Sequence, residues 1–178
     1  TVIQKVVIGR LKKHMEKNEL LSDNQNAYRA HRSVTTAVLQ LYDDVLKHQE
    51  KGVDSACIFL DCSAAFDTIS HDVLIGKMGL YGVDEKGIRW MRDYLKDRAQ
   101  FVSVGGTRSQ IKKILDGTFQ GSIGGPWCFL LMINDVVVLC KAGHFVIFIY
   151  ADDTCRRVSL TGDMEKDQEN LDKIMKEI

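Results

Sequence analysis

Residues 145–153 read Phe-Val-Ile-Phe-Ile-Tyr-Ala-Asp-Asp, and residues 56–61 read Ala-Cys-Ile-Phe-Leu-Asp. Each stretch is a short apolar run that ends in aspartate. Runs of this length favour buried strands over helices. If the two strands are neighbours, Asp61 and Asp152 lie at the same end of one sheet.

The rest of the chain combines helical and extended patterns. Apolar residues at helical spacing predict a first helix over residues 2–19, and Ser33 is placed to cap a second helix that ends near Gly52. Pro126 fits the first turn of a buried helix over 127–140, because its missing N–H is not needed there. Further helices are predicted at 71–80, 84–98 and 163–178. Paired strands are predicted at 101–106 and 110–115 around a Gly-Gly turn region, and a further strand at 158–160. The mixture of helices and antiparallel strand pairs predicts an α+β fold.

The composition is that of an ordered globular chain, with 45% hydrophobic and 27% charged residues. The 178 residues suit one domain or two small lobes. Lysine plus arginine total 24, as do aspartate plus glutamate. This balance excludes a uniformly basic, histone-like binder but not a local basic face. The longest apolar run, Phe145–Ala151, is too short for a membrane helix, so we expect no membrane partner.

The cysteines indicate the redox compartment of the protein, and the first residue indicates whether the chain is a fragment. The sequence contains five scattered cysteines: Cys57, Cys62, Cys128, Cys140 and Cys155. Their odd number and the lack of a Cys-x-x-Cys pair argue against a disulfide framework or a zinc site. Free thiols in a reducing, intracellular compartment are the simplest interpretation. The chain begins with Thr1 and shows no signal peptide, so we expect a fragment.

Two converging carboxylates repel each other unless a cation lies between them. Hard oxygen ligands suit Mg²⁺, which binds through one or two protein carboxylates plus substrate phosphates. Two such ions, about 3.5–4 Å apart, can hold both oxygens of an in-line phosphoryl displacement. The alternative is an ordinary turn, because Asp152-Asp153 after a strand is also common turn chemistry.

Four segments in order along the chain resemble a known family. Residues 59–71, Phe-Leu-Asp-Cys-Ser-Ala-Ala-Phe-Asp-Thr-Ile-Ser-His, resemble motif A of reverse transcriptases. Residues 120–126, Gln-Gly-Ser-Ile-Gly-Gly-Pro, resemble motif B, and residues 150–153, Tyr-Ala-Asp-Asp, resemble motif C. Residues 24–33 resemble the finger segment of the same enzymes. The forms of motifs A and C are most similar to those of non-LTR, LINE-type retrotransposon enzymes.

The resemblance implies a right-hand polymerase. Its palm would be a small antiparallel sheet backed by helices, accompanied by partial fingers. Residues 1–54 would form the fingers part and residues 55–178 the palm, with a fingers insertion within 80–118. A thumb would be absent from this chain.

The family also implies roles for the carboxylates. Asp61 and Asp152 would be the principal metal ligands, and Asp153 would be a third carboxylate with looser coordination. The backbone carbonyl of Cys62 would complete a metal shell. The cofactor would be two Mg²⁺ ions, with Mn²⁺ as a substitute.

Five further residues would contact the incoming dNTP. Phe66 stands where similar enzymes place an aromatic steric gate against the 2′-hydroxyl. Gln120 and Gly121 would face the nucleotide, because glycine permits close backbone approach. Arg29 and Arg32 would grip the triphosphate through guanidinium forks. The alternatives are a core phenylalanine, a helix-entry loop and a solvated loop, respectively.

Residues 86–113 contain eight basic and two acidic residues. This segment is a candidate track for a nucleic-acid backbone, and a solvated helix face is the equal alternative. Four positions differ from the family pattern: Thr118-Phe119 replaces a usual Val-Pro, Gly124 a bulky apolar residue and Ala27 a glycine. A decaying copy of a mobile element would carry such changes.

The function that follows is RNA-templated DNA synthesis by an RNA-directed DNA polymerase. Its partners would be an RNA template, a DNA primer, dNTPs and other domains of the same polyprotein. The family resemblance implies a location in the nucleus and cytoplasm. Two alternatives stay open: a catalytically inactive nucleic-acid-binding relic of such an enzyme, and a different palm enzyme such as a nucleotide cyclase.

Overall fold

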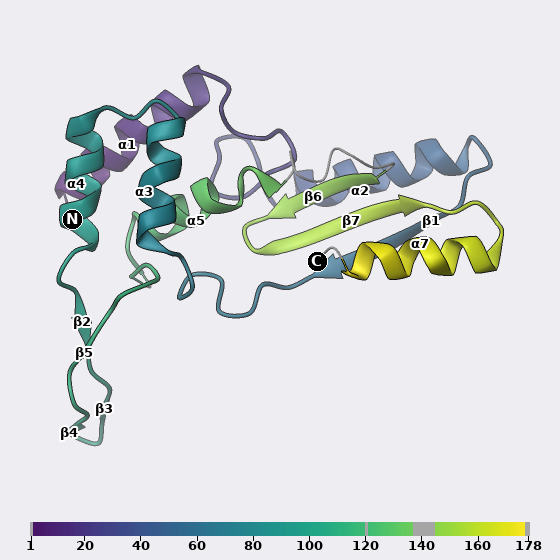
Figure 1. Cartoon of the computed structure of the whole chain (residues 1–178). Coiled ribbons are helices and arrows are strands. Elements are labelled where there is room, and N and C mark those ends of the chain that lie inside the picture. Colours follow the sequence, from purple (N-terminus) through teal and green to yellow (C-terminus); the bar gives the residue numbers. More distant parts are fainter. Residues whose placement is uncertain (1, 120, 137–144, 177–178) are drawn as a thin grey trace. The chain divides into compact units, whose positions relative to one another are not determined.

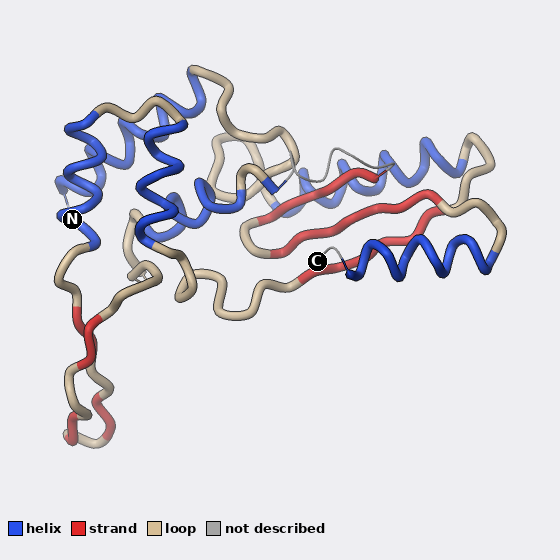
Figure 2. The backbone as a smooth tube through the Cα atoms, viewed as in Figure 1, coloured by secondary structure: helices blue, strands red, loops and turns tan. Residues whose placement is uncertain are grey.

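The computed structural model describes residues 2–119, 121–136 and 145–176 (Figure 1). The chain divides into two compact units, and each unit combines two separate stretches of sequence. Unit 1 contains Thr1–Ser22 and Ser63–Asn134, and unit 2 contains Asp23–Cys62 and Asp135–Ile178. Unit 1 is mainly helical, whereas unit 2 holds the main sheet (Figure 2).

The sheet of unit 2 has three antiparallel strands in the order β1-β7-β6. They are β1 (Ser55–Leu60), β6 (Phe145–Tyr150) and β7 (Asp153–Ser159). The sequence predicts β1 and β6 almost to the residue, because an uninterrupted apolar run marks each of them. The predicted burial of β1 is wrong, since none of its residues is buried and Phe59 is 74% exposed. The predicted return strand at 158–160 is too short, since β7 pairs with β6 along its whole length, from Tyr150 opposite Asp153 to Phe145 opposite Val158.

Two helices complete unit 2, namely α2 (Val34–Gln49) and α7 (Met164–Lys176). The predicted cap of α2 is confirmed. The Ser33 side chain accepts from the Thr36 N–H, and Thr36 returns a hydrogen bond to the Ser33 backbone. Helix α2 packs against all three strands. The buried Arg157 of β7 pairs with Asp44 of α2, which compensates for taking a charge out of water.

Unit 1 is built on four helices: α1 (Val2–Lys17), α3 (His71–Leu80), α4 (Glu85–Leu95) and α5 (Gly125–Ile133). Helix α3 packs against α4 and α5. The predicted start of α4 at residue 84 is its cap, since the Asp84 carboxylate accepts from the Gly87 N–H at 2.8 Å. The predicted helix 127–140 is shorter within the described residues, where α5 ends at Ile133. Residues 137–140 lie outside them.

Unit 1 also carries a hairpin, which we call the 99–113 hairpin. Its strands are β2 (Ala99–Gln100), β3 (Ser103–Val104), β4 (Thr107–Arg108) and β5 (Lys112–Lys113). β2 pairs with β5 and β3 with β4, both antiparallel. The predicted strands 101–106 and 110–115 are therefore wrong in extent. Gly105 and Gly106 both have positive φ, so they form the tight turn by themselves and β3 ends before them.

These elements confirm the α+β class. No helix among the described residues is long and apolar enough to cross a membrane. Cys57, Cys62, Cys128 and Cys155 are free thiols, as predicted, and Cys140 lies outside the described residues. The assignment of residues 1–54 to fingers and 55–178 to palm stays a prediction.

Candidate functional site

One end of the three-stranded sheet carries three aspartates. Asp61 directly follows β1, Asp152 lies in the turn between β6 and β7, and Asp153 is the first residue of β7. In the β1–β7 register Leu60 is opposite Thr154, so the next step along both strands brings Asp61 beside Asp153. The antiparallel topology thus delivers all three carboxylates from sequence positions far apart to one edge.

The pKa of the Cys62 thiol shows the effect of the negative charges at this edge of the sheet. This pKa is raised, first by partial burial and then by the negative charges of Asp152 and Asp61. Both carboxylates therefore lie close enough to Cys62 to oppose its ionisation. The side chain of Tyr28 reports on the same field, because burial raises its pKa and Asp152 and Tyr150 raise it further.

A divalent cation would find oxygen ligands here. Asp61 and Asp152 make no side-chain hydrogen bond or ion pair with any described residue, so their oxygens are available. Within the described residues, however, no group of three or more His, Cys, Asp and Glu side chains is arranged to hold a metal ion. The carboxylate oxygens suit Mg²⁺, because this ion binds to one or two protein carboxylates and completes its coordination shell with water and substrate phosphates.

A cavity of about 350 Å³ adjoins the carboxylates. It is enclosed by α2 and the three strands of unit 2 and is lined by Asp61 and Asp153 at its edge. Its other walls are mostly apolar and include the exposed Phe59 ring. The carboxylates therefore stand at the border between water and an apolar hollow.

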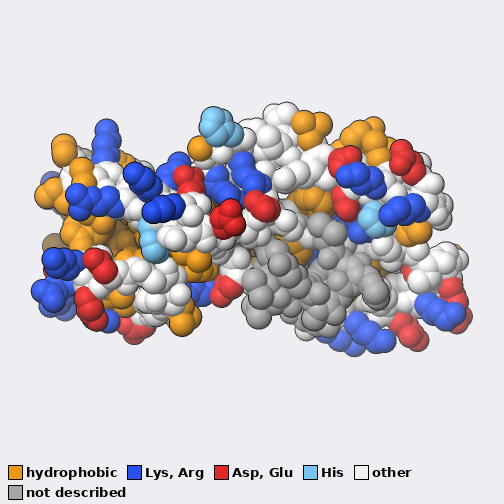
Figure 3. Space-filling model, turned by 90° about the horizontal axis from the view of Figure 1, so that it is seen from above, with side chains coloured by type: hydrophobic (Ala, Val, Ile, Leu, Met, Phe, Trp, Pro, Cys, Tyr) orange, Lys and Arg blue, Asp and Glu red, His pale blue; other side chains and the backbone are white. Residues whose placement is uncertain are grey.

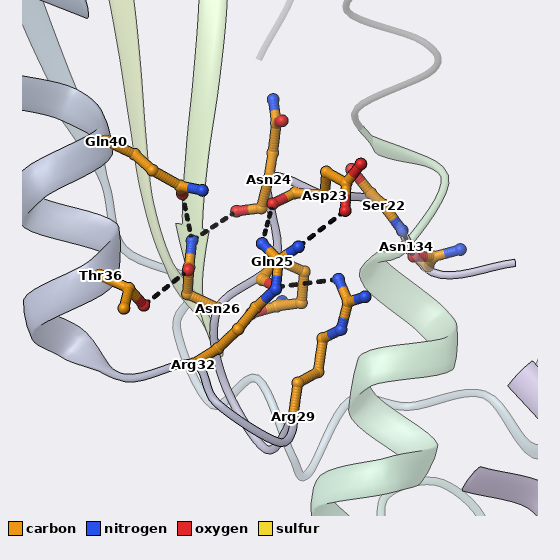
Figure 4. A network of polar contacts seen from close by, with 10 residues as sticks. All are labelled: Ser22, Asp23, Asn24, Gln25, Asn26, Arg29, Arg32, Thr36, Gln40 and Asn134. Carbon is orange, nitrogen blue, oxygen red and sulfur yellow. Dashed lines mark hydrogen bonds and ion pairs between the residues drawn. The ribbon is translucent and has the colours of Figure 1, made fainter. Parts of the chain in front are cut away.

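The turn that carries Asp152 is held by residues 24–26, whose side chains Figure 4 shows. This segment lies beside β6, with a bridge between Gln25 and Ile149. The Ile149 N–H donates to the Asn24 carbonyl at 2.9 Å, and the Asn26 N–H donates to the Ile149 carbonyl at 2.8 Å. Residues 24–26 therefore protect the outer edge of β6 in the way a fourth strand would.

Gln25 makes the contact closest to the aspartates. Its Oε1 accepts from the Ala151 N–H at 3.3 Å and from the Ala27 N–H at 2.8 Å. Ala151 has a φ of 56°, a left-handed conformation that is costly for alanine. The buried Gln25 amide thus stabilises a strained residue directly before Asp152.

Asn26 connects this segment to α2. Its Nδ2 donates to Gln40 Oε1 at 2.7 Å, and its Oδ1 accepts from the Thr36 hydroxyl at 2.9 Å (Figure 4). Sequence reasoning assigned no role to Gln25, Asn26 or Tyr28, because within the segment 24–33 only the arginines were given a function. A buried amide run beside a strand is not visible in the pattern of apolar residues.

The two arginines of this segment are engaged within unit 2. Arg32 pairs with the Asp23 carboxylate at 2.7 Å and also donates to the Asp23 backbone carbonyl. Arg29 Nη1 donates to the Gln25 carbonyl at 3.3 Å (Figure 4). Contact with a triphosphate stays a prediction for both residues, and Arg32 would exchange Asp23 for it.

The remaining predicted residues belong to unit 1. The half-buried Phe66 ring packs against Phe129, with ring centroids 4.9 Å apart. Gly121 has a φ of 75° and an open surface, as a close backbone approach requires. Gln120 lies outside the described residues.

Gly117 supports the Phe66 loop and was not predicted. It has a φ of 88°, and a Cβ there would lie 2.7 Å from the Asp67 carbonyl oxygen. Its N–H donates to the Ile69 carbonyl at 2.7 Å, and the neighbouring Thr118 N–H donates to the Phe66 carbonyl at 2.9 Å. Only glycine fits this approach, so the segment before motif B is tied to the loop within motif A.

Comparisons with known proteins agree with these motifs. The family model described as reverse transcriptase (RNA-dependent DNA polymerase) matches residues 1–178. The probable RNA-directed DNA polymerase from transposon BS of Drosophila melanogaster is 28% identical over 156 residues. The RNA-directed DNA polymerase from mobile element jockey of the same species is 26% identical over 164 residues. These alignments cover 84% and 86% of this chain, which spans 17% of the length of each relative.

Among solved structures, apo telomerase from Candida tropicalis is similar in fold, with a TM-score of 0.65 and 13% sequence identity. The match covers 95% of this chain and 34% of the telomerase chain. At this identity the likeness shows the fold alone. It confirms the right-hand polymerase fold that the motifs imply.

Proposed function

Because this chain belongs to the reverse transcriptase (RNA-dependent DNA polymerase) family, we propose that it is the catalytic core of an enzyme that copies RNA into DNA for a non-LTR retrotransposon. One observation carries this proposal. Asp61 and Asp152 stand together at the end of the three-stranded sheet, and neither makes an ion pair among the described residues. Carboxylates that share one field favour the binding of a divalent cation between them.

Asp61 and Asp152 are the proposed principal ligands of two Mg²⁺ ions, with Asp153 and the Cys62 carbonyl beside them. Bound Mg²⁺ would supply charge for the primer 3′-oxygen and for the departing pyrophosphate. The protein's own contribution is positioning. Gln25 holds the turn that orients Asp152.

The dNTP contacts are proposed from the motifs and their surroundings. Phe66 would select against the 2′-hydroxyl, and Gln120 and Gly121 would approach the nucleotide. Arg29 and Arg32 would contact the triphosphate. RNA template, DNA primer and the remaining domains of a polyprotein are the proposed partners, in the nucleus and cytoplasm.

The test is single-nucleotide incorporation on an RNA template with the chain in excess over primer. We expect slow extension with Mg²⁺ and none with EDTA. Asp152→Asn should reduce extension to the EDTA level, because it removes a ligand oxygen's charge. Asp54→Asn, at the opposite end of β1, is the matched control and should leave the rate unchanged.

Mn²⁺ binding, followed by electron paramagnetic resonance, distinguishes the main alternative. Carboxylate-dependent Mn²⁺ binding without any incorporation would identify an inactive relic. Full incorporation by Asp152→Asn would contradict the proposed site. A cyclic nucleotide product from ATP or GTP alone would favour the cyclase alternative.

The Phe66 role has its own test in the same assay. Phe66→Ala should raise the use of ribonucleotides relative to deoxynucleotides, because the ring no longer occupies the space of the 2′-hydroxyl. Phe66→Tyr keeps a ring and should keep the selectivity. If Phe66→Ala incorporates dNTPs with unchanged selectivity, the ring serves only to pack against Phe129.

A further inference from the structure

The zero net charge of the chain conceals a division between its units. Unit 1 contains 14 basic and 9 acidic residues, whereas unit 2 contains 10 basic and 15 acidic residues. The two units therefore carry formal charges of +5 and −5. The face drawn in Figure 3 shows charges of both signs, so the basic character of unit 1 must be located by segment.

Within the basic segment 86–113, the 99–113 hairpin is the part where basic residues stand without acidic neighbours in the chain. It carries Arg108, Lys112 and Lys113 and contains no aspartate or glutamate. In α4, by contrast, Lys86, Arg89 and Arg92 are accompanied by Glu85 and Asp93. Residues 86–98 contain five basic and two acidic residues and the hairpin three basic and none, so each part has an excess charge of +3, but only the hairpin carries it without an acidic residue.

The hairpin has no core of its own. Every residue from Ala99 to Lys113 is exposed, and the hairpin projects beyond the helices of its unit (Figure 1). Four of its exposed residues are large and apolar: Phe101, Val102, Val104 and Ile111. An isolated two-stranded hairpin is marginal in water, so a partner that covers it would stabilise it.

One side of the hairpin combines a cation with an aromatic ring. The Arg108 guanidinium lies over the Phe101 ring, 5.0 Å from its centroid, and 46% of Phe101 remains exposed. Lys112 and Lys113 follow on β5. Cations beside exposed aromatic rings bind unpaired nucleotides, because phosphates meet the charges and bases stack on the rings.

We propose that the 99–113 hairpin is a binding surface for single-stranded nucleic acid. Arg108, Lys112 and Lys113 contact phosphates, and an unpaired base stacks at Phe101. A duplex cannot make the stacking contact, since its bases are already stacked on one another. This surface goes beyond the proposed polymerase site, because it requires neither the aspartates nor a metal.

The test uses fluorescence anisotropy with the whole chain in EDTA, so that no synthesis occurs. The probes are labelled 20-nucleotide single strands of RNA and DNA and a DNA duplex of the same sequence. Arg108→Gln, Lys112→Gln and Lys113→Gln are combined in one variant. The matched control combines Lys166→Gln, Lys173→Gln and Lys176→Gln on α7 of unit 2.

We expect the hairpin variant to bind single strands at least about tenfold more weakly than the control. The slope of log affinity against log salt should fall by about 2, because each phosphate contact on a single strand contributes about 0.7. The RNA and DNA arms show which strand the surface prefers. Equal losses in the hairpin variant and the α7 control would overturn the proposal.

Phe101→Ala tests the stacking contact. It should weaken single-strand binding about tenfold and leave duplex binding unchanged, as loss of a base–aromatic contact predicts. Unchanged single-strand binding, or an equal loss for the duplex, would contradict the assignment. Because the assay is run in EDTA and measures binding alone, a failure of the polymerase proposal leaves this result intact. Circular dichroism confirms folding, which these exposed substitutions should preserve.

Discussion

Both units contain antiparallel β-structure, but the three-stranded sheet of unit 2 and the 99–113 hairpin of unit 1 differ in what stabilises them. In the sheet, Ile147, Phe148 and Ile149 of β6 are buried, and β7 is paired on both edges. In the hairpin, every residue from Ala99 to Lys113 is exposed and each ladder pairs only two residues with two.

The difference separates two functions of β-structure within one chain. The sheet buries apolar surface and can therefore hold charged groups at its end in a fixed arrangement. The hairpin buries almost nothing and presents its side chains to a partner. Burial accordingly predicts where substitutions cost stability, and exposure predicts where they change binding alone.

The largest expected effect comes from one substitution made in both regions. Ile149 is 1% exposed in β6, whereas Ile111 is 73% exposed in the hairpin. Ile149→Ala should lower the free energy of unfolding by about 2–5 kcal/mol, because it removes buried methyl groups and leaves a cavity. Ile111→Ala should change it by less than about 0.5 kcal/mol.

Urea unfolding followed by circular dichroism measures both values. A similar loss in the two variants would mean that the hairpin is covered in solution, which would break the contrast. A small loss for Ile149→Ala would show that the sheet is less tightly packed than its burial indicates.

The same contrast explains which elements could be predicted from the sequence. Strands β1 and β6 were predicted because short continuous apolar runs favour strands, although only β6 has buried residues. The hairpin strands were misplaced because their register depends on Gly105 and Gly106, whose positive φ values set the turn. Nothing in the apolar pattern of an exposed segment fixes a register.

The candidate site likewise contains some residues that the sequence could predict and others that it could not. Their positions at strand ends indicated Asp61 and Asp152, the family resemblance added Asp153, and the strand register places all three at one edge. The contacts of Gln25 with Ala151 and of Gly117 with Asp67 join segments far apart in sequence, so no local pattern predicts them. Their roles depend on the fold itself.

A smaller effect on stability is expected from substituting a buried polar side chain, whose contribution comes from hydrogen bonds and not from apolar contacts. Gln25 is 1% exposed, and its Oε1 accepts from two backbone N–H groups, those of Ala27 and Ala151. Gln25→Met keeps the volume but removes this acceptor. Gln100→Met makes the same change on β2 of the hairpin, where the side chain is exposed.

Gln25→Met should destabilise the chain by about 1–3 kcal/mol, because two buried donors lose their partner. The loss of stability should lie toward the lower end of this range. The buried Gln25 Nε2 has no hydrogen-bond partner among the described residues, so removing it also relieves an unfavourable burial. Gln100→Met should be within about 0.5 kcal/mol of the unmodified chain. Because Ala151 precedes Asp152, Gln25→Met should also weaken Mn²⁺ binding, whereas Gln100→Met should not. If Mn²⁺ binding survives in a destabilised Gln25→Met, the amide supports the fold without orienting the carboxylates.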